Sequence, residues 1–536
     1  MVLDTRRGTF LYWASVALIV AGLFIPRLLP CVDYPQHLGL SDVARRLRDA
    51  SAPEQATFRL NYFTYNGLFH TVVAWLSRAL PVEMVGRALV VSALVAKAGG
   101  VLALVRVTRR PSAHAALFLP VLFSFALGWG FVNYVLSTAI AVWALVLVAR
   151  AVVEPSLWLA AAIAALGLAC GFAHVLGLIV LCVASAALAL ELAWRVAPIA
   201  GSWTRRLAWI GSRAGVAGLP LLAGCVYCIL VYRRQYAWAP RMYQDPVLEG
   251  TGPTLGRKLL GFASYTLDLF PDATGRVLLW ATLVTMMGAA VLLAFAPRDL
   301  QGSKRGSPPA FVAPLFVLTV AYAVTPTVLM GTHLIFQRLG QFVVLGAVLA
   351  MPAFPPSARG WAERWIPTLA VLSSVNVVLH CGVYAWETND ASRVIDELPP
   401  GRPATAVIWD PGTRAFRKGT LTHLAAYYAA RKHGEWAFAF ARYLSLPVRF
   451  RPGAQPAWPT RGWEFNASAY DARCKYARAF PLVIVEAPRS LPEDASGEAP
   501  LRRLVFRQDA DAVKLLSHHG RFWAFDTAGL PDDGTS

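Results

Sequence analysis

The feature that most constrains this chain is a series of apolar stretches, each 17–23 residues long, that recur from Phe10 to Trp386. A helix of this length crosses the ~30 Å hydrocarbon layer of a bilayer. The stretches are continuous and do not alternate with polar residues over ten-residue segments, which favours helices over the strands of a membrane barrel. Only 15% of the residues are charged, against about 25% in a typical soluble protein. We therefore predict an all-α polytopic membrane protein.

Hydropathy and charge together predict the topology. Basic connectors at 106–110, 195–213, 298–305 and 359–364 all fall on the cytoplasmic side if the N-terminus is cytoplasmic. This placement explains the net charge of +19 without nucleic acid, for which no binding module is visible. The short apolar segment 66–82 is predicted to be an interfacial helix on the outer surface, because counting it as a span would export 106–110. The eleven predicted spans are 10–29, 84–106, 114–130, 131–150, 156–172, 173–194, 215–232, 277–296, 310–330, 332–351 and 366–386.

This topology divides the chain into two predicted domains. Residues 1–386 form a transmembrane domain with a first outer loop at 30–83 and a second at 233–276. Residues 387–536 form an extracytoplasmic C-terminal domain. Strand-like runs at 404–409, 482–486, 504–507 and 521–525, with a helix near 421–433, predict that this domain is a small α/β unit.

The first outer loop opens with a carboxylate and an imidazole four positions apart, Asp33 and His37. If a helix starts at Pro35, Asp33 lies near its N-terminus, where an anion is favoured. Two interpretations follow. Asp33 is either a helix cap beside a surface histidine, or a catalytic carboxylate at the membrane surface.

Further polar residues fall at the predicted outward turns of three helical hairpins. Such residues are costly within or near hydrocarbon, so we expect them to face a polar cavity or one another. The alternative is that each makes a hydrogen bond in helix packing. They lie on the same predicted side as Asp33 and are Asn133, His174, His333, Gln337 and Arg338.

Arg338 has a permanent charge and a planar fork of donors, which suits a lipid-linked phosphate. The alternative is an arginine that extends toward the outer headgroups. In the second outer loop, Asp268 and Asp272 offer a second carboxylate, or are ordinary loop acids.

Several segments carry a resemblance to known proteins. At Asp33-Tyr-Pro-Gln-His37-Leu, Trp129-Gly-Phe-Val-Asn133-Tyr and His174-Val-Leu-Gly, the chain resembles a large group of uncharacterised bacterial polytopic proteins that have no established activity. The resemblance continues at Thr422-His423-Leu-Ala-Ala and at 447–452, so it covers most of the chain.

More distantly, the chain resembles the GT-C superfamily of membrane glycosyltransferases, such as protein mannosyltransferases and lipid A aminoarabinose transferases. Members have a cytoplasmic N-terminus, interfacial helices before the second span and an acidic residue in the first outer loop. The resemblance implies that Asp33 acts as a base or helps to hold a divalent metal. The chain departs from the pattern because His37 follows Asp33 where the superfamily often has a second carboxylate.

The resemblance implies a glycosyltransferase on the outer face of a bacterial inner membrane. Its partners would be membrane lipid and a polyprenyl-phosphate-linked sugar, because nucleotide sugars are cytoplasmic, and its acceptor an envelope component. Asp33 would deprotonate the acceptor, and His37 would orient Asp33 or contact the sugar phosphate. Arg338 and His333 would stabilise the departing phosphate. The cavity would be lined by Asn133, His174 and Gln337.

The alternative is a non-enzymatic transporter or flippase of an envelope lipid or glycan precursor. Such a protein needs polar residues at many depths of the bilayer to form a path. Lys97 is the only strongly charged residue deep within a predicted span. The sequence itself leaves open whether the protein is an enzyme.

Overall fold

The computed structural model describes residues 6–49, 51–198, 202–238, 253–267, 269–294, 311–329, 332–351, 354, 356–456, 459 and 462–531. The chain forms two compact units. The helical unit comprises residues 1–22, 90–127 and 133–379, and the mixed unit comprises 23–89, 128–132 and 380–536. Each unit is described by itself.

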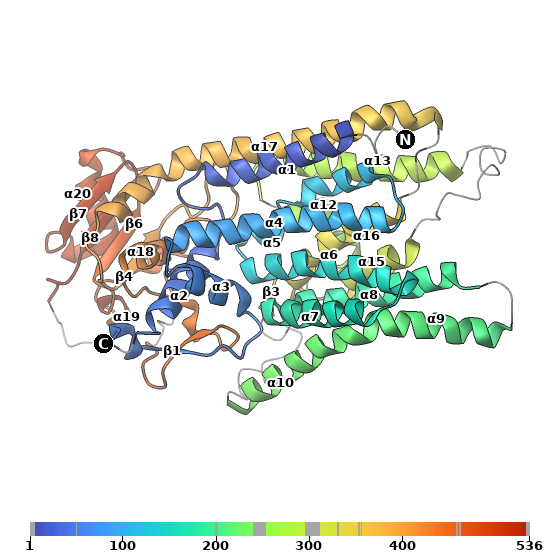
Figure 1. Cartoon of the computed structure of the whole chain (residues 1–536). Helices are drawn as coiled ribbons and strands as arrows, with labels where there is room; N and C mark the ends of the chain where they lie inside the picture. Colours follow the sequence, from blue (N-terminus) through green and yellow to red (C-terminus); the bar gives the residue numbers. More distant parts are fainter. Residues whose placement is uncertain are drawn as a thin grey trace. The chain divides into compact units, whose positions relative to one another are not determined.

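Helices build the helical unit, as the apolar stretches predict (Figure 1). Helices α1, α4 and α17 continue into the mixed unit, and α5 and α6 each have one terminal residue in it. The elements are α1 (Arg6–Phe24), α4 (Val82–Val107), η2 (Ser112–Val121), α5 (Phe125–Gly128), α6 (Val132–Val153), α7 (Leu157–Ala173), α8 (Val175–Val196), α9 (Trp203–Gly218), η3 (Leu219–Leu221), α10 (Leu222–Trp238), α11 (Leu255–Leu260), α12 (Phe262–Leu267), α13 (Thr274–Ala294), α15 (Val312–Val324), α16 (Ile335–Ala350), α17 (Pro356–Glu397) and the two-residue strands β2 (Val328–Leu329) and β3 (Thr332–His333).

Many of these helices suit a bilayer. Within the described ranges, six helical stretches are long and apolar enough to cross a membrane: 7–24, 82–107, 132–153, 175–196, 203–235 and 360–397. Four shorter apolar stretches accompany them. The prediction of a multi-pass, mostly helical membrane protein is therefore confirmed.

Some predicted spans are not continuous α-helices of the predicted length. The predicted span 114–130 corresponds to the apolar helical stretch 112–128, but this stretch is not a continuous α-helix. It forms the 3₁₀ helix η2, with Pro120 inside it, followed by the short helix α5. Proline lacks the N–H that a regular helix needs at that position. Within 311–329, the described part of the predicted span 310–330, the helix α15 covers 13 residues and the strand β2 follows it. The segment 66–82 contains α3 (Leu68–Leu76), which at about 1.5 Å per residue is too short to cross a bilayer.

Small residues allow the helices of this unit to approach closely. A Cβ on Gly224 of α10 would lie 2.4 Å from the carbonyl oxygen of Gly167 on α7. A Cβ on Gly177 of α8 would lie 2.1 Å from the hydroxyl of Ser137 on α6. Such glycines are typical of helix packing in membranes, where close backbone contact replaces the hydrophobic effect. Figure 1 also shows α1 beside α17, where a Cβ on Gly22 would lie 3.3 Å from Val378.

The mixed unit combines residues 23–89 and 128–132 with the C-terminal segment, residues 380–536. Its four-stranded sheet has the order β4-β6-β8-β7, in which only the β4–β6 pair is parallel. Its elements are α2 (Tyr34–Arg46), η1 (Pro53–Gln55), β1 (Phe58–Leu60), α3, β4 (Ala404–Ile408), α18 (Leu424–Lys432), η5 (Phe440–Arg442), β5 (Val448–Phe450), η6 (Ala467–Ala469), α19 (Lys475–Arg478), β6 (Leu482–Glu486), η7 (Ala495–Gly497), α20 (Glu498–Phe506), η8 (Arg507–Asp509), β7 (Lys514–His519) and β8 (Phe522–Asp526).

Most of the predicted α/β pattern of the C-terminal segment is confirmed. The strands expected at 404–409, 482–486 and 521–525 are β4, β6 and β8, and the helix near 421–433 is α18. The strand expected at 504–507 is wrong, because residues 498–506 form α20, whose buried Leu501 and Val505 recur at helical spacing. Sequence reasoning missed β7, an edge strand with a mainly polar sequence.

A strand pair and a helix pair join residues 23–89 to the C-terminal segment within the mixed unit. Strand β1 pairs with β5 in antiparallel register, with Phe58 opposite Phe450. Helix α2 packs on α18 in a shared core that includes Leu40, Val43 and Ala426. This packing fixes the start of α2, and therefore the backbone next to Asp33.

Candidate functional site

Asp33 precedes α2, and its backbone is fixed by the turn at 128–130. The amide of Val32 donates to the carbonyl of Gly128 at 3.0 Å, and the amide of Asp33 donates to the carbonyl of Trp129 at 2.9 Å. Gly130 has φ +78°, and an added Cβ there would lie 2.6 Å from the amide nitrogen of Asp33. The turn therefore requires glycine at 130, both for its backbone conformation and for the closeness of the Asp33 segment.

The side chain of Asp33 does not cap α2, although the residue stands at the N-cap position. Its Oδ1 instead lies 3.3 Å from Nε2 of His423, and Nδ1 of the same ring lies 3.4 Å from Oε1 of Glu464. His423 stands at the N-cap of α18 and also leaves its helix uncapped. Because α2 packs on α18, the two uncapped helix starts bring a carboxylate and an imidazole together. We call Asp33, His423 and Glu464 the acid–imidazole–acid cluster.

The cluster is largely shielded from solvent. The side chain of His423 is 2% exposed, that of Glu464 12% and that of Asp33 15%. Gln36, one turn along α2 from Asp33, places its amide nitrogen 3.1 Å from Nδ1 of His423. A small pocket beside the ring is lined by Gln36, Thr422, His423 and Glu464 together with Trp436 and Phe438.

Burial raises the pKa of Glu464 to about 7. The negative charge of Asp33 also raises it, whereas His423 and Arg442 lower it. A carboxyl group that titrates near neutrality holds a proton that most surface acids have already lost.

His37 lies in the same unit but has other partners. Its Nδ1 is 3.1 Å from Nε2 of His70, whose Nδ1 is 3.1 Å from the hydroxyl of Ser41. That hydroxyl donates to the carbonyl of His37 at 2.7 Å, so it can only accept from His70. The protons therefore sit on Nδ1 of both rings, and Nε2 of His37 keeps a lone pair. Burial lowers the pKa of His37 to about 4, which keeps this ring neutral.

The helical unit contains the other predicted site residues. His174 caps α8 by accepting the amide of Leu176 at its Nδ1, at 3.1 Å, so in the neutral ring the proton lies on Nε2. That nitrogen is 3.4 Å from Nη1 of Arg338. The Nε2–H of His174 and the guanidinium of Arg338 therefore face the same region, and this arrangement favours the binding of an anion. The ring of Tyr134 packs against both, and its hydroxyl donates to the carbonyl of Arg338 at 2.9 Å.

The remaining predicted residues of this unit have different surroundings. His333 contributes its carbonyl, which accepts from Nη2 of Arg338 at 2.9 Å, while its side chain is exposed. Gln337 and Asn133 are buried. The structure therefore joins the side chains of His174 and Arg338 and the backbone of His333 in one group.

Two other sequence candidates have structural roles. Lys97 is buried and donates to Oε1 of Gln341 at 3.0 Å. Asp272 accepts from the amide and hydroxyl of Thr274 at the start of α13, at 3.3 and 2.9 Å. Asp268 lies outside the described residues.

The acid–imidazole–acid cluster is not arranged to hold a metal ion. Asp33 and Glu464 contact opposite nitrogens of the His423 ring, so their oxygens flank the imidazole and do not converge on one point. Among the described residues, no group of three histidine, cysteine or acidic side chains is arranged to hold a metal ion. The reaction proposed for this protein uses no metal ion.

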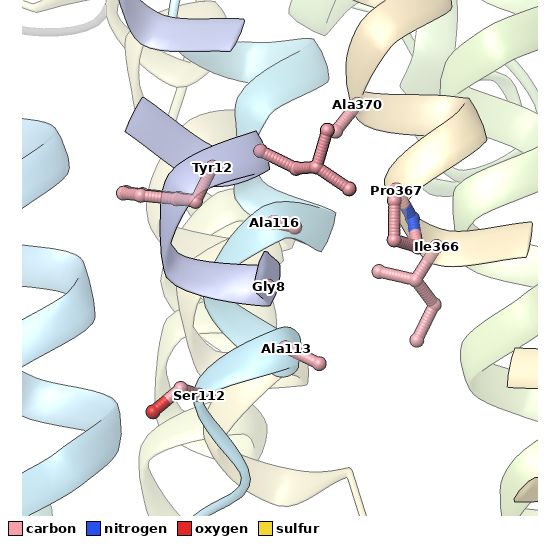
Figure 2. Close-up of a pocket in the computed structure, with 9 residues that line it drawn as sticks. Gly8, Tyr12, Ser112, Ala113, Ala116, Ile366, Pro367 and Ala370 are labelled. Atoms are coloured by element: carbon pink, nitrogen blue, oxygen red, sulfur yellow. The ribbon is translucent and has the colours of Figure 1, made fainter. Parts of the chain in front are cut away.

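A second pocket, within the helical unit, offers no chemistry of its own. Figure 2 shows its lining at α1, η2 and α17, which is apolar apart from the hydroxyls of Tyr12 and Ser112. Both hydroxyls have protein partners, the carbonyl of Ala98 and the side chain of Arg106.

Sequence reasoning did not assign His423 or Glu464 to the site. His423 lies in one of the segments that carry the family resemblance, which was a signal that could have been followed. Glu464 carries no sequence signal, because it lies in a segment without regular secondary structure.

No protein-family model and no curated protein matches the chain. Two solved structures of ArnT from Cupriavidus metallidurans are similar over nearly the whole chain. The apo state has 13% sequence identity and a TM-score of 0.45, and covers 97% of each chain. The form bound to undecaprenyl phosphate has 11% identity and a TM-score of 0.47, and covers 98% of each chain. Likeness at this level is too low to transfer an activity to this protein.

Proposed function

We propose that the protein is a membrane glycosyltransferase that transfers a sugar from a polyprenyl-phosphate donor to an envelope acceptor, on the outer face of a bacterial inner membrane. The observation that carries the proposal is the contact between Asp33 and His423. A carboxylate that leaves its helix uncapped and faces a buried imidazole is arranged as a general base.

In the proposed reaction, Asp33 takes the proton of the acceptor hydroxyl. The acceptor oxygen forms a bond to the anomeric carbon of the sugar, and the bond from that carbon to the phosphate oxygen breaks. The electron pair leaves with the polyprenyl phosphate. Proton removal increases the nucleophilicity of the acceptor oxygen as the bond forms.

The other predicted residues have supporting roles in this proposal. The lone pair on Nε2 of His37 accepts a hydrogen bond from a hydroxyl of the acceptor or the sugar. Arg338 and His174, whose N–H groups face one region, bind the phosphate of the donor and stabilise its charge as it departs. Gln337 and Asn133 line the binding cavity.

The test is a transfer assay with radiolabelled polyprenyl-phosphate-linked sugars and purified protein. Asp33→Asn keeps the shape of the side chain and removes its basicity, so we expect transfer to fall by about 100-fold or more, with unchanged yield in the membrane. Asp49→Asn changes an exposed carboxylate of the same loop and should leave the rate unchanged. A wild-type rate in Asp33→Asn would remove the base from the mechanism.

The second candidate is a transporter or flippase of an envelope lipid or glycan precursor. Such a protein needs polar residues at many depths of the bilayer, and Lys97 is the only strongly charged residue deep within a predicted span. Because the ammonium group of Lys97 is buried against Gln341, it is placed to hold α4 to α16 and not to line a path. Movement of labelled polyprenyl phosphate across vesicles without sugar transfer would favour this candidate.

A further inference from the structure

The amide of Gln36 has only one orientation that satisfies its neighbours. Its Oε1 accepts from the indole N–H of Trp436 at 2.8 Å and from the backbone N–H of Phe440 at 3.1 Å. Both partners can only donate, so the oxygen must face them. The amide nitrogen then donates to the carbonyl of Phe438 at 3.1 Å, and its other hydrogen points toward His423.

This orientation determines where His423 carries its proton. The amide nitrogen of Gln36 lies 3.1 Å from Nδ1 of His423 and has no lone pair to accept with. Nδ1 must therefore be the acceptor and carry no proton. In the neutral ring the proton lies on Nε2, the nitrogen 3.3 Å from Asp33.

The second acid of the cluster agrees with this proton position. Oε1 of Glu464 lies 3.4 Å from Nδ1, the same nitrogen that faces Gln36. An ionised carboxylate at that place would favour a proton on Nδ1, whereas a protonated carboxyl does not. Burial raises the pKa of Glu464 to about 7, which favours the protonated form around neutral pH. The charged and titratable groups that act on Glu464 are Asp33, His423 and Arg442.

We propose that Gln36 is a positioning residue: it holds His423 in the Nε2–H tautomer, so that the ring presents a donor to Asp33. The Nε2–H is buried and makes no hydrogen bond, because Oδ1 of Asp33 lies 3.3 Å away but is poorly aligned with it. Catalytic hydrogen bonds often become well aligned only when substrate binds. With substrate bound, the donor orients Asp33 so that its other oxygen faces the acceptor hydroxyl. The catalytic part of this inference rests on the proposed function, whereas the tautomer does not.

The first experiment is ¹⁵N NMR of the full-length protein labelled at histidine, with the His423 signals identified by their loss in His423→Gln. We expect Nε2 to be protonated and Nδ1 unprotonated. In Gln36→Glu a carboxylate faces Nδ1, so a proton should appear on that nitrogen. The control Gln55→Glu makes the same change at an amide that bonds to the carbonyls of Leu47 and Asp49, and should leave the His423 signals unchanged. A protonated Nδ1 in the wild type would overturn the inference without any variant.

The second experiment measures transfer from the radiolabelled polyprenyl-phosphate sugars. Because the wrong tautomer misorients the base, Gln36→Glu should lower kcat by about tenfold or more while KM changes little. Gln55→Glu should retain the wild-type values. A switched tautomer with an unchanged kcat would overturn the positioning role. If the wild type shows no transfer, the proposed function fails, and the NMR result still decides whether Gln36 sets the tautomer.

Discussion

At the residue scale, the decisive feature is that two N-cap residues do not cap their helices. An N-cap carboxylate normally accepts from the first free amides of its helix, which stabilises the protein by about 1 kcal/mol. Asp33 forgoes that contact and lies against His423. Both helix starts also favour negative charge through their dipoles. The simpler interpretation of Asp33 as a helix cap therefore does not describe its side chain.

The raised pKa of Glu464 predicts a pH-dependent stability. The folded protein keeps this proton up to about pH 7, whereas an unfolded chain loses it near pH 4.5. The folded state thus binds more protons between these values, and stability falls as the pH rises through this window. Glu464→Gln removes the effect, so the variant should be more stable than the wild type at pH 8, by up to roughly 3 kcal/mol, with little difference at pH 4.5.

Thermal denaturation in detergent at several pH values measures this difference. Glu493→Gln, at an exposed carboxylate, is the matched control and should follow the wild type. A Glu464→Gln variant with the same pH dependence as the wild type would contradict the prediction.

At the element scale, a turn and two packed helices position the cluster. The turn at 128–130 holds the backbone of Val32 and Asp33, and α18 holds the ring of His423 against α2. The sequence indicates the turn through its glycines. It does not indicate that the turn hydrogen-bonds to a segment almost 100 residues earlier in the chain.

Gly130→Ala tests the role of the turn. The new Cβ would lie 2.4 Å from the amide nitrogen of Tyr34 and 2.6 Å from that of Asp33, so the Asp33 segment must move. We expect sugar transfer to fall by about tenfold or more, because small displacements of a catalytic group are costly. Gly453→Ala places alanine at a similar φ of +80° with no atom within 4 Å of the Cβ, and should leave transfer unchanged. Equal losses in both variants would assign the effect to backbone strain alone.

At the scale of the whole molecule, the mixed unit is built from segments at both ends of the sequence. Strand β1 of the first outer loop pairs with β5 of the C-terminal segment, and α2 packs on α18. Because these segments contact one another, both must lie on the same side of the membrane. The predicted topology satisfies this condition, because it places residues 30–83 and 387–536 outside.

Reporter fusions test this sidedness. We expect alkaline phosphatase to be active when fused after Ser536, inserted after Asp49, or fused to a chain that ends at Thr325, before the segment that leads to Arg338. A green fluorescent protein at the N-terminus should fluoresce, because it remains in the cytoplasm. If alkaline phosphatase is active when inserted after Asp49 but inactive when fused after Thr325, Asp33 and Arg338 lie on opposite sides of the membrane. That result would rule out the proposed reaction.

The helical character of the membrane domain and most strands of the C-terminal segment could be predicted, because each depends on the local pattern of apolar residues. The errors have local causes as well. Pro120 breaks the regular helix expected over 114–130, and the apolar residues of 498–506 fit a helix better than a strand. Asp33 could be singled out because it lies just beyond the first apolar stretch, on the same predicted side as the polar turns of three helical hairpins.

The sequence by itself determined that the chain crosses a membrane, since the length of an apolar run is fixed before any tertiary contact forms. Only the tertiary structure decided which groups surround Asp33. Gln36 and His423 are 387 positions apart, and Glu464 lies farther still along the chain. No local pattern relates such residues, because they meet through the packing of α2 on α18. Because of that packing, the carboxylate at the N-cap position of α2 faces an imidazole and becomes a candidate base.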